Sequence, residues 1–199
     1  MRPFFWVGIV ALLTACATPA PRLSDAEAQQ RWELRQQVLR TVQVWTLSGR
    51  VAVYTPDEGW NASVHWRQHP DTYDLRVIAP LGGGSLQLRG DASGGVVAQT
   101  SKGEVYRSSD AESLLRERTG VALPVASLRY WVLGQPDPRD GAAESVLDGH
   151  GRLARLRQGG WSVSYTSYRA VGDLELPDRI VLDNGRYKVR LVVDRWDLV

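Results

Sequence analysis

Short segments in which every second side chain is apolar constrain the fold of this chain more than any other feature of its sequence. Residues 45–53 follow this pattern, and residues 60–68 repeat it. A period of two is typical of a β-strand that buries one face and exposes the other. Because Pro56-Asp57-Glu58-Gly59 favours a turn between the two segments, we expect them to form a hairpin.

Further segments of the same kind predict more strands, separated by Gly-rich or polar turns. They cover residues 73–79, 85–89, 96–100, 104–107, 152–158, 161–168, 179–182 and 187–196. The turn Asp183-Asn184-Gly185 between the last two is typical of a tight hairpin. About ten short strands with hairpin connections indicate a mostly β protein built on a single antiparallel, strongly curved sheet.

Three helices are predicted beside these strands. Ser24, with a Glu three residues later, has the spacing of a capping box and predicts a helix that extends to about residue 44. Asp110 begins a second helix that stops at Gly120, and Pro124 begins a third. The helices must cover the apolar face of the sheet, and two packings are open. They close an incomplete β-barrel around an apolar cavity, or they plug a small solid core.

The composition supports one folded domain and excludes several classes of protein. Of the 199 residues, 43% are hydrophobic and 23% are charged, a balance that supports a core and excludes a disordered chain. The formal net charge of +2 is too even for an electrostatic nucleic-acid binder, so no nucleic acid is expected as a partner. A single cysteine excludes an intrachain disulfide framework and cysteine-rich metal sites.

The N-terminal residues have the pattern of a secretion signal. Residues 4–13 are almost all apolar, but as a helix they would extend only about 15 Å, half of a bilayer core of about 30 Å. The run ends in Leu13-Thr14-Ala15-Cys16, which resembles the bacterial lipobox. The alternative is an ordinary cysteine that follows a signal peptide with a small-residue cleavage site.

The lipobox resemblance implies cleavage before Cys16, a diacylglycerol on its thiol and an acyl chain on its new amino group. Ala17, in place of an Asp, implies sorting to the outer membrane, where the protein is lipid-anchored on the periplasmic face. The expected organisation is a signal peptide over residues 1–15, a lipidated tether over residues 16–23 and an incomplete β-barrel lipid-binding domain over residues 24–199.

Patterns typical of enzymes are missing from the sequence or have structural explanations. The chain has no G-x-S-x-G nucleophile elbow and no G-x-x-x-x-G-K-[ST] phosphate loop. His65 and His69 have a spacing that suits metal ligation on a helix, but on the predicted strand they stand about 13 Å apart. Asp110 and Glu112 form a carboxylate pair that helix capping explains. We therefore predict no catalytic residue, no metal site and no cofactor.

Leu81 stands in a segment whose composition otherwise favours a turn. Pro80 precedes it and residues 82–84 are glycines, so its neighbours in sequence offer little to pack against. Two interpretations are open. Leu81 folds inward as a core plug, or it forms an exposed apolar tip that contacts a membrane or a hydrophobic partner.

Short motifs rich in aromatic, glycine and proline residues follow the lipobox in order along the chain. They are Trp45-x-Leu47-x-Gly49-Arg50-Val51-Ala52, Trp60, Trp66-x-Gln68, Tyr73-x-Leu75, Pro80-Leu81-Gly82, Gly120, Leu123-Pro124, Leu128-x-x-Trp131-x-x-Gly134, Trp161-x-Val163-x-Tyr165, Leu176-Pro177 and Trp196. Each motif is weak alone. The ordered set, which runs from about residue 12 to residue 196, resembles the LolB family of outer-membrane lipoproteins.

This resemblance implies a function in lipid transfer. The chain is expected to accept acylated lipoproteins, its cargo, from a periplasmic carrier that resembles LolA and to insert them into the outer membrane. The resemblance also implies an unclosed β-barrel with a helical lid and an apolar cavity for acyl chains, and it implies that Leu81 engages the membrane. Because transfer involves no covalent step, neither an enzymatic activity nor a nucleotide is expected.

Alternation and the resemblance together select nine candidate residues for the wall of the acyl-chain cavity. They are Trp45, Leu47, Val51, Trp60, Val64, Trp66 and Leu75 on the predicted strands, with Leu128 and Trp131 on the lid. The competing interpretation is a structural or adaptor lipoprotein of the outer membrane, whose solid core docks an envelope complex. A lipid-modifying enzyme is disfavoured because the nucleophile set is missing.

Overall fold

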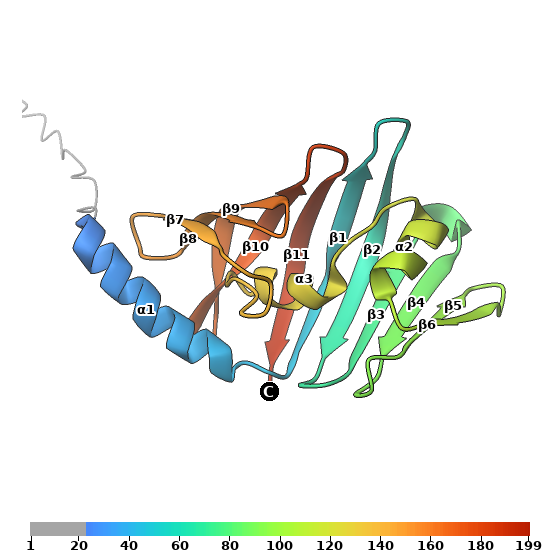
Figure 1. The fold of residues 1–199 in the computed structure, drawn as a ribbon, viewed down its shortest axis with the longest axis horizontal. Helices are drawn as coiled ribbons and strands as arrows, with labels where there is room; N and C mark the ends of the chain where they lie inside the picture. The colour runs from blue at the N-terminus through green and yellow to red at the C-terminus, as the bar shows by residue number, and fades with distance from the viewer. Residues whose placement is uncertain (1–22) are drawn as a thin grey trace, which may run out of the picture.

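The computed structural model of the chain describes residues 23–199 (Figure 1). The predicted signal peptide, the lipobox cysteine Cys16 and all of the predicted tether except its last residue lie outside the described residues. None of the helices in the described part is both long and apolar enough to cross a bilayer.

Eleven strands form one open antiparallel sheet in the order β6-β5-β4-β3-β2-β1-β11-β10-β9-β8-β7. They are β1 (Trp45–Tyr54), β2 (Gly59–Gln68), β3 (Tyr73–Ile78), β4 (Ser85–Gly90), β5 (Val96–Thr100), β6 (Val105–Ser108), β7 (Glu144–Leu147), β8 (Leu153–Gln158), β9 (Trp161–Val171), β10 (Leu174–Asp183) and β11 (Lys188–Leu198). The sheet curls without joining its edge strands β6 and β7, which confirms the predicted incomplete β-barrel (Figure 1).

The first and last strands form the seam between the two halves of the sheet. Strands β1–β6 and strands β7–β11 each follow chain order, and β1 pairs with β11 to connect them. The register of this pair shifts between Ser48 and Gly49. A side chain at Gly49 would place its Cβ 2.2 Å from the Val192 carbonyl oxygen, so the two backbones approach this closely only because residue 49 is glycine.

Three α-helices accompany the sheet: α1 (Asp25–Thr41), α2 (Ala111–Thr119) and α3 (Val125–Trp131). Helices α2 and α3 lie over the face toward which the sheet curls, whereas α1 runs beside the end formed by β7–β10 (Figure 1). The predicted capping box is confirmed, because the Glu27 amide donates to the Ser24 hydroxyl and the Ser24 amide donates to the Glu27 carboxylate. Trp32 and Leu39 of α1 are buried in the common core and pack the helix against it.

Two strands depart from the sequence prediction for local reasons. Strand β7 is absent from the predicted strands, because its side chains Glu144 and Val146 are exposed at the sheet edge and give no buried alternation. Strand β10 begins at Leu174, five residues before the predicted strand. Pro177 lies inside it, where the pairing with β9 shifts register, and a proline disfavours a strand in sequence-based prediction.

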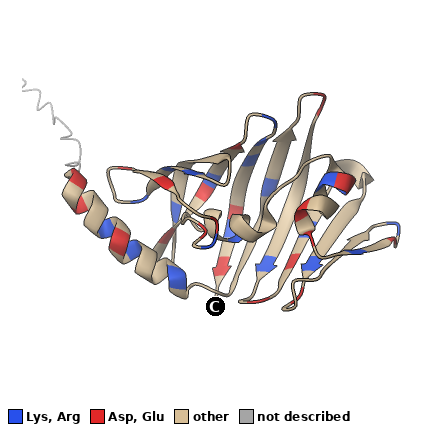
Figure 2. Ribbon diagram, viewed as in Figure 1, with Lys and Arg blue, Asp and Glu red and all other residues tan. Residues whose placement is uncertain are grey.

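The two faces of the sheet differ in polarity, and the stability of the fold comes mainly from the inner face. Charged side chains of both signs are spread over the strands and helices (Figure 2). On the outer face, Arg50 and Asp194 form an ion pair of 2.8 Å, but such exposed pairs contribute at most about 1 kcal/mol. The inner face instead buries a continuous cluster of Leu, Val and Trp side chains.

Candidate functional site

An apolar cavity lies between the inner face of the sheet and a roof formed by α2, α3 and the segment that connects them. Its volume is about 80 Å³. The sheet contributes Leu47, Val51, Val53, Trp60, Val64, Trp66, Leu75, Val77, Leu182, Val189 and Leu191. The roof contributes Leu115, Thr119, Leu123, Leu128 and Val132. The Thr119 hydroxyl donates to the Leu115 carbonyl at 2.7 Å, so its hydrogen is already used within α2.

Strand register explains why residues distant in sequence meet in this wall. Leu47 on β1 lies opposite Trp66 on β2, and Trp66 lies opposite Leu75 on β3. Across the seam, Val53 on β1 lies opposite Val189 on β11. Since directly opposed residues in antiparallel strands point to the same face, the alternation in each strand produces one continuous apolar surface.

Part of the cavity wall reaches the surface of the molecule. Five lining residues are only half-buried, and we call them the mouth: Val51, Trp60, Val77, Thr119 and Leu123. Val77 is the last inward-facing residue of β3, directly before the connection to β4. The mouth therefore lies at the end of the sheet where β3 turns into β4.

Seven of the nine predicted cavity residues surround this cavity. They are Leu47, Val51, Trp60, Val64, Trp66, Leu75 and Leu128. The remaining lining residues are Val53 on β1, Val77 on β3 and others from β10, β11 and the roof. Alternation in residues 187–196 already marked Val189 and Leu191 as buried, but only the pairing of β1 with β11 brings them to the cavity.

The structure does not place Trp45 and Trp131 in the lining. Trp45 packs in an aromatic cluster, with its ring centroid 5.2 Å from that of Trp66 and 5.4 Å from that of Trp196. Trp131 has no exposed surface, and its indole N–H donates to the Gln158 side-chain oxygen at 3.0 Å. Trp131 is on the predicted helix, but its side chain faces β8 rather than the cavity.

A buried polar network fixes the C-terminal end of α3 to the sheet. The Tyr165 hydroxyl donates to the Trp131 carbonyl at 2.9 Å, and the Gln158 side chain accepts from the Asp137 backbone amide at 2.9 Å. The Asp137 carboxylate accepts from the Ser127 hydroxyl and from the Arg139 guanidinium. Burial opposes ionisation of Asp137, but the hydrogen bonds from Arg139 and Ser127 outweigh it and lower its pKa.

Leu81 projects from the connection between β3 and β4 as an exposed tip. It lies in a 3-10 turn, η1 (Pro80–Gly82), and its side chain is fully exposed to solvent. Its φ of 52° is in the left-handed region, and in the described residues no other non-glycine residue has a positive φ. Backbone hydrogen bonds from Ala79 to Gly84 and from Gly83 to Pro80 close the loop beneath it. The core-plug interpretation is therefore wrong.

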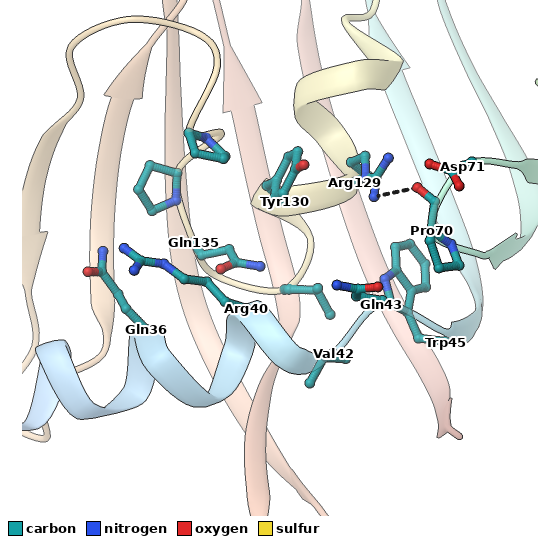
Figure 3. Close-up of a pocket in the computed structure, with 13 residues that line it drawn as sticks. Gln36, Arg40, Val42, Gln43, Trp45, Pro70, Asp71, Arg129, Tyr130 and Gln135 are labelled. Carbon is teal, nitrogen blue, oxygen red and sulfur yellow. Dashed lines mark hydrogen bonds between the residues drawn. The ribbon is translucent and has the colours of Figure 1, made fainter. Parts of the chain in front are cut away.

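A separate groove of about 460 Å³ lies between the C-terminal half of α1, the turn after β2 and the start of the segment that follows α3 (Figure 3). Arg129 crosses it and donates to the Pro70 carbonyl at 3.0 Å (Figure 3). Its wall includes Arg40, Tyr130 and Trp45 beside several amide and proline side chains. None of its lining residues belongs to the apolar cavity.

The described residues contain no group of three or more His, Cys, Asp or Glu side chains that could hold a metal ion. His65 lies on the exposed face of β2, where its Nδ1 is 3.1 Å from the Ser48 hydroxyl. Asp110 caps α2, since its carboxylate accepts from the Glu112 backbone amide at 3.0 Å. Asp110 therefore has the capping role that the sequence predicts, and His65 is an exposed side chain.

Comparison with known proteins connects this architecture to one family. The family model described as "Outer membrane lipoprotein LolB" matches residues 43–196. An outer-membrane lipoprotein LolB from Nitrosococcus oceani is 38% identical over 187 residues, which cover 94% of this chain and 92% of that protein. The LolB protein of Chromohalobacter salexigens is 33% identical over 196 residues, with 98% of this chain and 90% of that protein covered.

Solved structures show the same fold at very low sequence identity. A LolA superfamily protein from Nitrosomonas europaea aligns with a TM-score of 0.55 and 9% identity, over 86% of this chain and 93% of that chain. A DUF1329 family protein from Desulfovibrio piger aligns with a TM-score of 0.56 and 8% identity, over 86% of this chain and 92% of that chain. These similarities confirm the curved open sheet with its helices.

Proposed function

The chain belongs to the LolB family of outer-membrane lipoproteins, and from this premise we propose that it accepts acylated lipoproteins from a LolA-like periplasmic carrier and inserts them into the outer membrane. Cys16 carries the lipid anchor, after removal of residues 1–15. Residues 17–23 then tether the domain, with a reach of about 25 Å when fully extended. This keeps the domain close to the membrane that receives the cargo.

The observation that carries this proposal is the apolar cavity under its roof of two short helices. Each methylene group that leaves water for an apolar environment gains about 0.8 kcal/mol, so a continuous wall of Leu, Val and Trp suits acyl chains. An engineered apolar cavity of about 150 Å³ binds a molecule only as large as benzene. Since this cavity measures about 80 Å³, an acyl chain enters only when the roof moves away from the sheet.

Leu81 is suited to deliver the cargo because of its position and its exposure. It follows the mouth residue Val77 by four positions, so the tip and the mouth lie on the same strand connection. A leucine side chain that enters the apolar boundary of a bilayer gains about 1.5–3 kcal/mol. The tip thus brings the mouth against the membrane at the moment of release.

Transfer in this scheme needs no covalent step and no nucleotide. The cavity must bind the acyl chains more tightly than the carrier does and less tightly than the bilayer does. Affinities that rise along this path move the cargo in one direction. No side chain of the domain acts as a nucleophile or as an acid–base group.

The small volume of the cavity also favours a second candidate, an adaptor lipoprotein whose core is solid and whose surface docks an envelope complex. The two candidates differ in whether the folded domain takes up an apolar ligand. We expect the soluble domain that lacks residues 1–16 to bind an apolar fluorescent dye at concentrations where its circular dichroism is unchanged. The adaptor interpretation predicts no such binding.

The transfer itself is tested by mixing that soluble domain with carrier loaded with an acylated lipoprotein. The expected result is that the lipoprotein leaves the carrier and co-purifies with the domain. A second step adds vesicles of outer-membrane lipid and the full-length protein, and measures cargo that floats with the vesicles. Cargo that stays on the carrier in the first step would show that the domain is not an acceptor.

A further inference from the structure

A polar groove adjoins the apolar cavity at its mouth. It is an open hollow of about 740 Å³, and three mouth residues, Trp60, Val77 and Thr119, line both it and the cavity. We call it the mouth groove. By contrast, the groove beside α1 and a groove of about 440 Å³ on the outer face, which Arg155 and Lys188 line, share no lining residue with the cavity.

The side chains of the mouth groove offer both hydrogen-bond donors and acceptors. Lys102, at the turn between β5 and β6, and Arg118, in the last turn of α2, supply donors. The Arg118 guanidinium carbon lies 3.7 Å from the centroid of the Tyr106 ring, which holds the side chain in place. Glu58 and Glu104 supply carboxylates, so the lining contains two cations and two anions and the groove as a whole is close to neutral.

The loop that carries Leu81 forms one wall of the same groove. Ala79, Gly83 and Gly84 line it, while Leu81 itself points into solvent. A ligand in the mouth groove therefore touches the loop that bears the apolar tip on one side and the roof of the cavity, through Thr119, on the other side.

We infer that the mouth groove binds the uncharged polar head of the acylated ligand, that is, the ester and amide carbonyls of its lipidated cysteine and the first peptide groups that follow. The inference rests on the proposed function, because it takes the acyl chains to occupy the cavity. An amphiphile whose chains enter the cavity must leave its head at the mouth. Lys102 and Arg118 offer these carbonyl groups charged donors, and a hydrogen bond with a charged donor is stronger than one between neutral groups.

The balance of charge distinguishes this head from that of a phospholipid. The amino group of the ligand's cysteine is acylated and its thiol is in a thioether, so the head carries no ionised group. A phosphate head would be favoured by an excess of cations and by forked arginine contacts. A groove with two carboxylates beside its two cations instead suits a neutral head that accepts and donates hydrogen bonds.

The inference is tested with a synthetic triacylated lipopeptide, whose binding is measured by displacement of an apolar dye from the soluble domain that lacks residues 1–16. For Lys102→Ala combined with Arg118→Gln, we expect lipopeptide affinity to fall at least about tenfold, the effect of one lost hydrogen bond to a charged group. Affinity for the dye, which has no such head, should stay within about twofold. The single variant Lys102→Arg keeps the donors and should retain the lipopeptide affinity.

A matched control removes two cations elsewhere. Lys188→Ala combined with Arg155→Ala changes the outer-face groove by the same charge and should leave lipopeptide binding unchanged. Because Arg118 packs on Tyr106, Lys102→Ala alone, at an exposed turn, is measured as a variant that keeps α2 intact, and it should still weaken lipopeptide binding.

Three results would overturn the inference. The first is an unchanged lipopeptide affinity both in the double variant of Lys102 and Arg118 and in Lys102→Ala alone. The second is an equal loss of affinity for dye and lipopeptide. The third is that a lysophospholipid competes with the lipopeptide and that its affinity falls by the same factor in the variants. This result would show that the groove binds a phosphate head. Failure of the unaltered domain to bind either dye or lipopeptide is a different outcome, because it refutes the proposed function itself.

Discussion

Leu81 combines full exposure of an apolar side chain with a left-handed backbone. Each feature is unfavourable in water, and a backbone conformation of this kind costs about 1–3 kcal/mol. Most other leucines of the described residues are buried or half-buried, whereas the geometry of its own loop places Leu81 outside. The strain supports a role for the side chain in contact with another surface.

A charge at Leu81 should impair the insertion of cargo into the membrane without impairing the uptake of cargo by the domain. Leu81→Glu should leave the thermal unfolding midpoint and cargo uptake unchanged, because the side chain touches neither core nor cavity. Insertion of cargo into vesicles should be largely lost, since a carboxylate does not enter the acyl boundary. Leu81→Phe is the matched control and should insert cargo normally. Normal insertion by Leu81→Glu would refute the tip hypothesis.

The buried Asp137 carboxylate should make the free energy of unfolding depend on pH in the acidic range. Its pKa is lowered in the folded state, so its stabilising effect is complete above its unfolded value of about 4 and is lost as the pH falls through the folded value. We expect Asp137→Ala to lower the free energy of unfolding at pH 7 by about 1–3 kcal/mol. Urea unfolding measures this difference, which should shrink toward pH 3.

The control for this acid dependence is Asp173→Ala, at an exposed turn, where stability should change little at either pH. A difference between the Asp137 variant and the unaltered protein that is constant from pH 7 to pH 3 would show that the effect is packing and not charge.

At the scale of elements, the two roof helices are attached in different ways. The end of α3 is fastened by the buried network of Trp131, Gln158 and Tyr165. Within the described residues, α2 contacts the sheet through apolar side chains such as Leu115 and through Arg118 on Tyr106. The α3 half of the roof is therefore fixed by buried hydrogen bonds, whereas the α2 half is held by apolar contacts and by the stacking of Arg118 on Tyr106.

Hydrogen exchange should detect this difference. Backbone amides of α2 should exchange faster than those of α3, because opening α2 breaks no buried hydrogen bond to the sheet. Gln158→Ala leaves the Trp131 indole and the Asp137 amide without their partner, so it should bring α3 exchange close to that of α2. Equal exchange in both helices of the unaltered domain would contradict the model of a roof that opens at α2.

Strand positions could be predicted from the sequence, whereas the orientation of a short helix and the conformation of a loop could not. Alternation placed Leu47, Val64 and Trp66 correctly, because a strand buries every second residue whatever its partners are. The position of Trp131 depends on which way a seven-residue helix faces, and helical spacing does not decide between the cavity and β8. The exposure of Leu81 depends on one backbone angle, which composition does not specify.

At the scale of the whole molecule, the open sheet and its roof together enclose one ligand cavity. A larger side chain in its wall should reduce ligand uptake without unfolding the domain, because Val51 lies at the mouth where the packing is incomplete. For Val51→Phe, we expect dye affinity to fall about tenfold, with an overpacking cost of at most about 1–3 kcal/mol. Val192→Phe, on the outer face of β11, is the control and should bind dye normally.

The seam between β1 and β11 should be the most sensitive part of the sheet to added volume. Gly49→Ala places a methyl group against the Val192 carbonyl, so the strands must separate, and we expect a loss of about 1–3 kcal/mol in unfolding free energy. At Gly59 the nearest atom to an added Cβ is 3.4 Å away, so Gly59→Ala should cost much less. Similar losses in both variants would show that the seam is not specially close.

The seam also sets an order of events during synthesis. Strands β1–β6 can pair with their neighbours once residue 108 has been made, but one edge of β1 has no partner until residues 188–198 arrive as β11. An unpaired edge in the middle of a future sheet is a template for aggregation, and pairing across such a sequence distance is slow. The solubility of the nascent N-terminal half therefore depends on how soon the last strand is released to complete it.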